Sequence, residues 1–338
     1  MLYDEKVEKK VVSDFAKALS CSYSVTLNLG QVLGADDDDL LLRSVVGFGS
    51  GVATMGDTCG AVNGAIIVLG RRFSELPSPQ FELVCSEFFR RLEQRVGTAN
   101  CGKVHGGKHL ASDFRRAILT GKSRKCMKIL KEGSEILAKL AQQVEEKDFS
   151  FIEEHDYAGI ERITQYFEQK SFHCCQSTIS EIGRQSSIQI EHISSPSRGF
   201  CGGIGFNGTL CGAIVGGVLC LGSRAGVDLS KSGYKDTLRI VFQGLLKSGG
   251  IFRDEKRFLP AKLYGQCQKV YRTVEEKYGG TDCQDILALR LDTENGVQQY
   301  IADNKIDLCH SIVQTVADTV ISVGPDFSPI EGSENGQP

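Results

Sequence analysis

The chain has 338 residues, with 39 basic and 42 acidic side chains and a net charge of −3. This length leaves room for two domains that each bury an apolar core. The slight negative charge gives no support for binding nucleic acid, and the longest apolar stretches, 61–70 and 213–222, are too short and glycine-rich to span a membrane. Because the chain starts without an apolar signal segment, we expect a cytoplasmic protein.

Helical patterns dominate the first half of the chain, and strand patterns are sparse. Apolar side chains at helical spacing, acidic starts, and proline or glycine at the ends predict the boundaries of the helices. Pro79, for example, opens a helix that Gly97 ends. The first-half helices are expected over residues 7–19, 21–33, 40–46, 79–97 and 123–147.

The second half repeats this order, with helices expected over residues 160–167, 175–182, 260–279 and 301–320. An insertion at 227–258 carries a candidate helix over 234–246, and its position after Cys211 suggests a cover or a docking surface for the second half. We therefore predict an all-α protein of two tandem, similar helical bundles with a helical insertion in the second. The bundles span residues 1–150 and 151–324 with a hinge near 147–155, and residues 325–338 form a polar tail that we expect to be disordered.

Ten of the thirteen cysteines form two matched sets of five. In chain order, Cys21, Cys59, Cys85, Cys101 and Cys126 recur as Cys174, Cys211, Cys267, Cys283 and Cys309. The spacing changes strongly only where about 30 residues are inserted in the later set, which indicates an internal duplication. Core packing rarely demands sulfur at five points, so the repeated thiols indicate metal or redox chemistry. In a reducing cytoplasm, metal ligands or transient redox thiols are favoured over structural disulfides.

A glycine-rich loop precedes one cysteine of each set. Residues 47–64 match 199–216, and the two loops deliver Cys59 and Cys211 to the start of an apolar helix. Unpaired backbone N–H groups and the helix dipole at such a position stabilise a thiolate. Two other interpretations stay open: a phosphate-binding turn, although the flanking signals of a nucleotide site are missing, and glycines that serve only close helix packing.

The order Cys, then Gly-x-x-Cys-Gly-Ala-x-x-Gly, then Cys, then Cys resembles the pattern of the C_GCAxxG_C_C family of redox-active proteins. Two tandem copies cover residues 5–147 and 156–323. The matching positions are Cys21, Cys59, Cys101 and Cys126, and then Cys174, Cys211, Cys283 and Cys309. The resemblance implies a redox role, and a similar domain in split-Soret cytochromes c implies an iron–sulfur cluster. Covalent haem is not expected, because the chain has no Cys-x-x-Cys-His.

Four thiolates from separate helices can enclose an iron–sulfur cluster, either [2Fe-2S] or [4Fe-4S]. The eight matching cysteines are therefore candidate metal ligands, with one cluster in each half. Backbone N–H groups of the glycine-rich loops could donate to the cluster, which makes Gly56, Gly60, Gly208 and Gly212 candidate cofactor-binding residues. Zinc is disfavoured because no close Cys or Cys/His pair occurs at zinc spacing.

The remaining cysteines and histidines carry weaker signals. Cys85 and Cys267 are either buried small hydrophobes or extra ligands and redox partners. His105 and His109 flank a glycine pair and are interpreted as part of a solvated or phosphate-attracting loop. The other residues of this kind are His173 and His310, which adjoin Cys174 and Cys309 and could hydrogen-bond near a cluster, and Cys175, Cys201 and Cys220, which are interpreted as core thiols.

The leading hypothesis is an iron–sulfur redox or electron-transfer protein that works with a ferredoxin- or flavoprotein-like partner, with a homodimer as one option. Nucleic-acid binding and a membrane span are not expected. One alternative is a metal-free thiol–disulfide oxidoreductase or redox sensor, in which Cys59 or Cys211 attacks and another cysteine resolves. A second is a reductase that uses the clusters on a small molecule, and a third is a helical repeat protein without redox chemistry.

Overall fold

The computed structural model of the chain describes residues 4–34, 38–106, 121, 123–153, 157–186, 188–247, 252–255 and 258–324. Within these residues every named element is a helix, which confirms the all-α prediction. The first half contains α1 (Glu5–Ala18), α2 (Cys21–Val32), α3 (Asp39–Ser44), the 3-10 helix η1 (Val45–Phe48), α4 (Gly60–Arg72), α5 (Gln80–Val96), α6 (Cys101–His105) and α8 (Ser123–Glu145).

The second half repeats most of these elements and adds the insertion helix. It contains α9 (Ser150–Glu153), α10 (Ala158–Gln169), α11 (Cys174–Gln185), α12 (Glu191–Ser194), η2 (Pro196–Phe200), α13 (Gly212–Ala225), α14 (Tyr234–Lys247), α15 (Ala261–Tyr278), α16 (Cys283–Leu287), α17 (Glu294–Ala302) and α18 (Ile306–Val323). The predicted tail 325–338 and His109 lie outside the described residues.

Local capping explains why most helix boundaries follow the sequence prediction. The Asp4 carboxylate accepts the backbone N–H groups of residues 6 and 7 at 2.9 and 3.0 Å, so α1 begins there. Ser20 caps α2 in the same way. Pro79 stands directly before α5, and Gly97 ends α5 with a φ of 83°, a left-handed conformation that suits glycine.

One expectation about the helices needs correction. Residues 301–320 do not form one helix: Ile301 belongs to α17, and α18 begins at Ile306. Asn304, with a φ of 48°, makes the turn between them.

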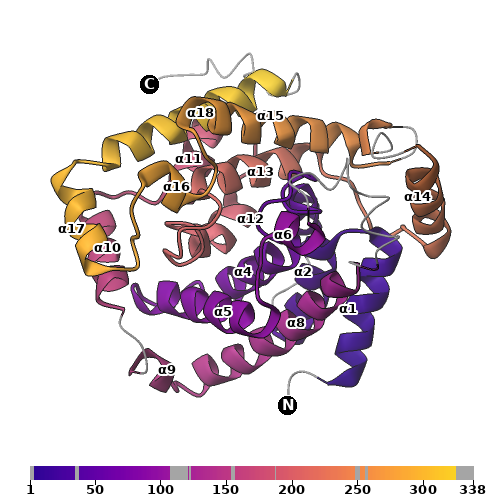
Figure 1. Cartoon of the computed structure of the whole chain (residues 1–338), viewed down its shortest axis with the longest axis horizontal. Helices are drawn as coiled ribbons and strands as arrows, with labels where there is room; N and C mark the ends of the chain where they lie inside the picture. The colour runs from indigo at the N-terminus through magenta and orange to yellow at the C-terminus, as the bar shows by residue number, and fades with distance from the viewer. Residues whose placement is uncertain are drawn as a thin grey trace, which may run out of the picture.

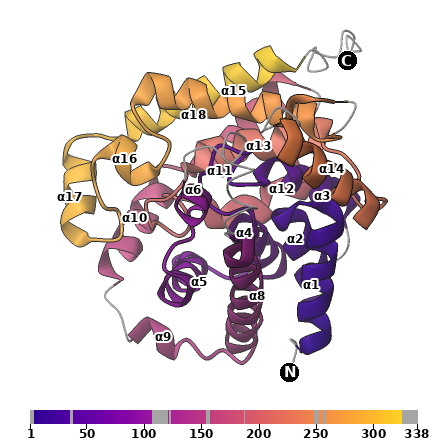
Figure 2. The same ribbon diagram turned by 45° about the vertical axis from the view of Figure 1, so that its right-hand side comes forward.

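The helix of the insertion, α14, contacts the first half, while Phe258 at the end of the insertion packs against Tyr264 of α15 in the second half, with ring centroids 5.1 Å apart. Helix α14 packs against α1 (Figure 2). The Tyr234 hydroxyl lies 2.7 Å from Ser13 Oγ.

The two halves follow the same plan around one buried helix each. In α4 the residues from Gly60 to Gly70 are all buried, and in α13 so are those from Gly212 to Gly222. Helix α2 packs on α4 as α11 packs on α13, and α8 covers the first half as α18 covers the second (Figure 1). The division into domains 1–150 and 151–324 stays a prediction, because the halves share an extensive boundary.

That boundary is built by two crossing loops. The loop that carries η1 leaves the first half and packs against α13 and α15, while the loop that carries η2 packs against α4 and α5. Glycine permits both crossings, because a Cβ at Gly199 would lie 2.8 Å from Cys85 Sγ and a Cβ at Gly47 would lie 3.0 Å from Cys267 Sγ. Where the loops meet, the rings of Phe48 and Phe200 stack with their centroids 6.4 Å apart.

Helix α18 is long and apolar enough to cross a membrane by length and composition, as the only such helix among the described residues. In the structure 44% of it is buried, against α11, α13 and α15. A core helix meets the same criteria, so this composition is explained by packing.

Candidate functional site

The first cysteine cluster consists of Cys21, Cys59, Cys101 and Cys126. Cys21 is the first residue of α2, Cys59 is the N-cap of α4, Cys101 is the first residue of α6, and Cys126 lies in the first turn of α8. The charges on Cys21, Cys101 and Cys126 all act on the pKa of Cys59, and Cys21 hydrogen-bonds its thiol. Four separate helix starts therefore place these four thiols near enough for their charges to interact.

A short backbone bridge fixes two members of the first cluster. The N–H of Cys59 donates to the carbonyl of Ala99 at 2.8 Å, and the N–H of Cys101 donates to the carbonyl of Asp57 at 2.8 Å. Thr58 and Asn100 form an isolated antiparallel bridge between these bonds. Two segments that are distant in the chain thus hold their cysteines side by side.

The second cysteine cluster, Cys174, Cys211, Cys283 and Cys309, repeats this construction. The N–H of Cys211 donates to Thr281 O at 2.8 Å and the N–H of Cys283 donates to Thr209 O at 2.7 Å, around the bridge between Leu210 and Asp282. All four cysteines line a single cavity of about 20 Å³. Its other walls are largely apolar and include Phe167, Phe172, Ile286, Leu287, Leu291 and Ile312.

The four candidate glycines divide into two kinds. Gly60 and Gly212 lie against the clusters: a Cβ at Gly60 would come within 2.7 Å of Cys21 Sγ, and one at Gly212 would collide with Cys174 Sγ. Gly56 and Gly208 instead make turns, with φ of 82° and 73°. Their carbonyls accept N–H groups that follow Cys101 and Cys283, at 2.6 and 3.0 Å.

The thiolate position differs from the one expected. Hydrogen bonds from Cys59 and from the backbone N–H groups of Ser50 and Ser22 lower the pKa of Cys21 to about 7. Contact with Cys21, together with burial, raises the pKa of Cys59 well above its usual value, so the N-cap cysteine is the donor of this pair. The helix start does stabilise a thiolate, but the sulfur that accepts its N–H groups belongs to the first residue of α2.

In the second cluster the cysteine with the lowered pKa is again the first residue of a helix, although its thiol also lies 3.7 Å from the Phe200 carbonyl, to which it can donate. The pKa of Cys174, the first residue of α11, is lowered by a hydrogen bond from Cys201 and by backbone N–H groups of Gly202 and Gly212. Burial and the charge on Cys174 raise the pKa of Cys211, while the backbone N–H groups of Ala213 and Ile214 at the start of α13 oppose the rise. Cys201 was interpreted as a core thiol, yet it contacts the cluster. The sequence offers one signal for Cys201: it replaces Gly49 of the first glycine-rich loop, so the second loop carries a cysteine that the first lacks.

Two further groups contact the clusters without having been identified from the sequence. His105 is 5% exposed, and its Nε2 lies 3.1 Å from Cys126 Sγ. The expectation of a solvated loop at His105 is therefore wrong, because α6 turns this side chain into the cluster. Tyr300 donates its hydroxyl to Cys309 Sγ at 3.3 Å. Neither residue has an equivalent group at the matching position of the other half, so the duplication gave no signal for them.

Cys85 and Cys267 lie where the loops cross. Both are fully buried, and neither lines the cavity of the second cluster or acts on the pKa of a cluster cysteine. Each thiol packs under the glycine of the opposite loop, which favours a packing role. Cys175 and Cys220 are fully buried as well. His310 packs edge-on against Phe172, with ring centroids 4.7 Å apart.

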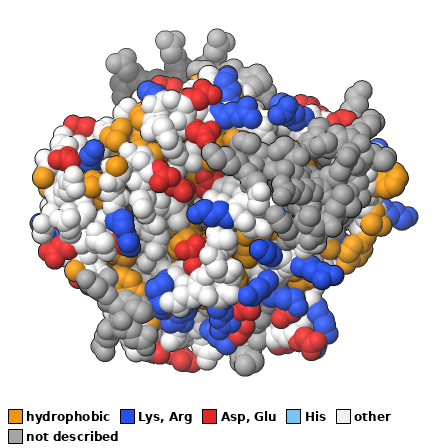
Figure 3. Space-filling model, in the orientation of Figure 1, with side chains coloured by type: hydrophobic (Ala, Val, Ile, Leu, Met, Phe, Trp, Pro, Cys, Tyr) orange, Lys and Arg blue, Asp and Glu red, His pale blue; other side chains and the backbone are white. Residues whose placement is uncertain are grey.

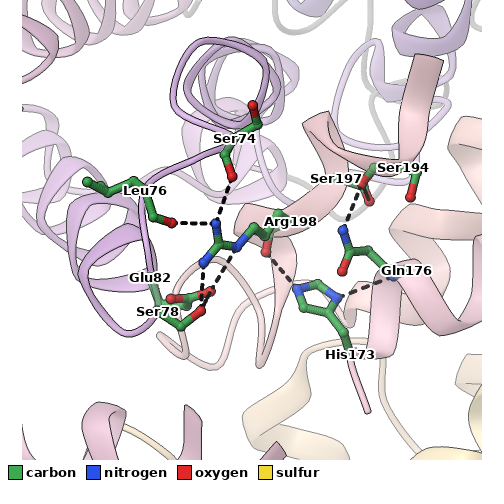
Figure 4. Close-up of polar contacts among 9 residues, drawn as sticks. All are labelled: Ser74, Leu76, Ser78, Glu82, His173, Gln176, Ser194, Ser197 and Arg198. Atoms are coloured by element: carbon green, nitrogen blue, oxygen red, sulfur yellow. Dashed lines mark hydrogen bonds and ion pairs between the residues drawn. The ribbon is translucent and has the colours of Figure 1, made fainter. Parts of the chain in front are cut away.

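Arg198 anchors the second cluster to the first half (Figure 4). Its guanidinium donates to the carbonyls of Ser74 and Leu76 at 3.1 and 2.6 Å and lies 3.5 Å from the Glu82 carboxylate. Its own carbonyl accepts Nε2 of His173 at 2.7 Å, while His173 Nδ1 caps α11. Burial lowers the pKa of His173 to about 4, so this neutral ring orients the start of the helix that carries Cys174.

Within the described part of the chain, no group of three or more His, Cys, Asp or Glu side chains is arranged to hold a single metal ion. A single zinc ion needs all its sulfur ligands at about 2.3 Å from one point. A polynuclear cluster binds its thiolates through different iron atoms and so accepts a wider set. The eight thiols of the two cysteine clusters match the second requirement in number and chemistry.

The model of the family described as "Putative redox-active protein (C_GCAxxG_C_C)" matches the chain twice, at residues 19–140 and 172–323. An uncharacterized protein from Archaeoglobus fulgidus is 26% identical over 144 residues, which cover 91% of that protein and 39% of this chain. No solved structure matches the chain. The two matches confirm the tandem duplication that the cysteines predicted.

Proposed function

The chain belongs to the C_GCAxxG_C_C family as two tandem copies, and from this premise we propose that each copy holds one iron–sulfur cluster on its four cysteines and transfers electrons. The observation that carries the proposal is the convergence of four thiols from four helices, once in each half, with those of the second half around one cavity. Four Cys ligands are the usual requirement of both [2Fe-2S] and [4Fe-4S] clusters.

The surroundings of the thiols suit such a group. Apolar side chains such as Phe167 and Phe172 exclude water, and donors such as the Tyr300 hydroxyl and the backbone N–H of Gly202 point at sulfur. Hydrogen bonds to ligand sulfur and a dry shell are the means by which proteins set a cluster's potential. A cavity of about 20 Å³ takes one water, so rotation of the four cysteine side chains has to provide the remaining room.

When bound, an iron–sulfur cluster supplies one-electron transfer. The chain's own residues hold the ligand sulfurs and shield them, and the different donors at the two clusters would give them different potentials. We propose a ferredoxin- or flavoprotein-like protein as the electron partner. The family's redox description supports a redox role of this kind.

A metal-free dithiol function is the second candidate, favoured by the direct contact between Cys21 and Cys59. In this case the Cys21 thiolate attacks a substrate disulfide and releases one thiol. Cys59 then displaces the second thiol and leaves a Cys21–Cys59 disulfide, so the substrate is reduced as the pair is oxidised.

Iron and acid-labile sulfide per chain, measured after anaerobic purification with absorption and electron paramagnetic resonance spectra, test the first proposal. We expect two clusters per chain, one of which is lost in Cys59→Ala and the other in Cys211→Ala. Cys220→Ala is the matched control, because Cys220 is fully buried but lies in neither cluster. Protein that stays colourless and iron-free after anaerobic reconstitution would refute the cluster proposal, and thiol counting before and after mild oxidation would then test the dithiol.

A further inference from the structure

The insertion carries most of the large apolar side chains that the protein exposes. Among the described residues five such side chains are exposed, and four of them lie in the insertion or directly after it: Tyr234, Leu238, Phe242 and Leu259. The fifth, Leu40, is the least exposed of the five. The segment that the first half lacks is therefore the one that presents large apolar side chains to the outside.

Helix α14 displays three of these side chains, Tyr234, Leu238 and Phe242, as an apolar ridge. They are four residues apart and so share one face of the helix. Leu238 and Phe242 are 67% and 64% exposed. Tyr234 and Thr237 hydrogen-bond to α1 through their hydroxyls, at 2.7 and 2.8 Å. Helix α14 is thus attached to α1 along one side while the apolar ridge stays outside.

A basic ridge runs beside the apolar one. Lys235 and Arg239 are exposed, and each lies three residues before a member of the apolar ridge. Neither cation takes part in an ion pair between described residues. The nearby Asp236 carboxylate accepts the Gly233 N–H at 3.1 Å, at the start of the helix. Figure 3 shows basic side chains beside apolar ones at the right-hand edge, where α14 lies in Figure 1.

The size of the apolar ridge selects the kind of partner. An aromatic side chain covers about 150–250 Å², so three side chains that are half to two-thirds exposed offer about 300–450 Å². Stable protein interfaces bury about 800 Å² on each partner, so the ridge is too small for a second copy of the chain or for a tight protein complex. A bilayer needs no matching surface, because apolar side chains enter the acyl boundary while neighbouring cations stay at anionic head groups.

The charge of the two ridges selects the kind of bilayer. Two unpaired cations beside the apolar ridge favour anionic over neutral lipid. The net charge of −3 belongs to the whole chain, and a Debye length of about 8 Å at physiological ionic strength limits its effect at α14.

We propose that α14 is a docking site for an anionic phospholipid surface, with Leu238 and Phe242 inserted at the acyl boundary and Lys235 and Arg239 at the lipid phosphates. Helix α14 then lies on the membrane without crossing it, and docking requires no iron in either cysteine cluster.

Cosedimentation of the full-length protein with sucrose-loaded vesicles tests the site. We expect binding to vesicles of equal parts phosphatidylglycerol and phosphatidylcholine and little binding to pure phosphatidylcholine. Binding should fall at about 1 M salt, where the Debye length is about 3 Å. Leu238→Ser with Phe242→Ser should weaken binding at least about tenfold. Lys235→Gln with Arg239→Gln should weaken it about fivefold for each cation.

Lys269→Gln with Arg272→Gln is the matched control. Both side chains are exposed, and the double substitution removes the same two charges from α15, a helix on which no large apolar side chain is exposed. This variant should bind anionic vesicles like the wild type. Because all the substituted side chains are exposed, circular dichroism should show an unchanged fold in every variant.

Three results would overturn the assignment: equal binding to both kinds of vesicle, equal weakening in the control, or wild-type binding by the Leu238→Ser and Phe242→Ser double variant. Sedimentation velocity without vesicles adds a fourth. Self-association that this double variant abolishes would assign the apolar ridge to a second copy of the chain instead.

Discussion

Replacing Arg198 by Met should destabilise the protein strongly and in a pH-dependent way. The side chain is 18% exposed and that of Glu82 is 4% exposed, so the substitution leaves a buried carboxylate without its cation. Breaking a buried pair in this manner costs about 3–5 kcal/mol. Urea unfolding of the full chain, followed by circular dichroism, measures the change in the free energy of unfolding.

The pH dependence follows from Glu82. Burial raises its pKa even though Arg198 opposes the shift, and in Arg198→Met the opposing charge is gone, so the pKa rises further. An acid whose folded pKa is raised contributes stability that is present below its unfolded pKa and is lost as pH rises through the folded value. The variant should therefore lose most stability at pH 8 and much less at pH 5.

A second substitution isolates the carboxylate. Adding Glu82→Gln to Arg198→Met removes the uncompensated charge, so about half of the lost stability should return at pH 8 and the pH dependence should flatten. Equal losses at pH 5 and pH 8, or a double variant no more stable than the single one, would show that Glu82 does not carry the effect.

Four other substitutions test the site and the buried hydroxyls. Gly212→Ala places a methyl group against Cys174 Sγ, at a stability cost of about 1–3 kcal/mol. On the proposed function, iron per chain should then fall by half, and unchanged iron would contradict the role of Cys174 as a ligand. Thr209→Val and Thr164→Val each remove an unpaired buried hydroxyl and should raise the free energy of unfolding by about 1 kcal/mol in urea. Tyr300→Phe deletes a donor to cluster sulfur, so redox titration should show a lower midpoint potential with full iron content, and an unshifted potential would argue against this bond.

The sequence was informative wherever a local rule determines the structure. The Pro79 to Gly97 pair acts on neighbouring backbone groups, so its effect can be read from adjacent residues. The two cysteine sets could also be identified from the sequence, because the duplication repeats the same spacing in both halves. What the family shows beyond this is a redox role.

The features that the sequence did not predict depend on contacts between residues that are distant in the chain. The pKa of Cys21 is lowered first by the hydrogen bond from Cys59 and then by the Ser50 N–H, and only the folded chain brings either group to Cys21. His105 reaches the first cluster through the packing of α6, which no spacing rule encodes. Cys201 reaches the second cluster through the crossing loop. The break at Asn304 was missed because apolar spacing continues across it.

The crossing loops also bear on how the chain folds. Residues near Gly47 complete the packing of α13 and α15, and residues near Gly199 complete that of α4 and α5. Each hydrophobic core is therefore covered in part by residues from the other half. Contacts of such large sequence separation slow folding, and a nascent first half would leave the ribosome with apolar surface still open. A family member with one copy would face the same shortfall and could close its core by exchanging the loop with a second chain. In the tandem protein the linker makes that exchange intramolecular and so independent of concentration.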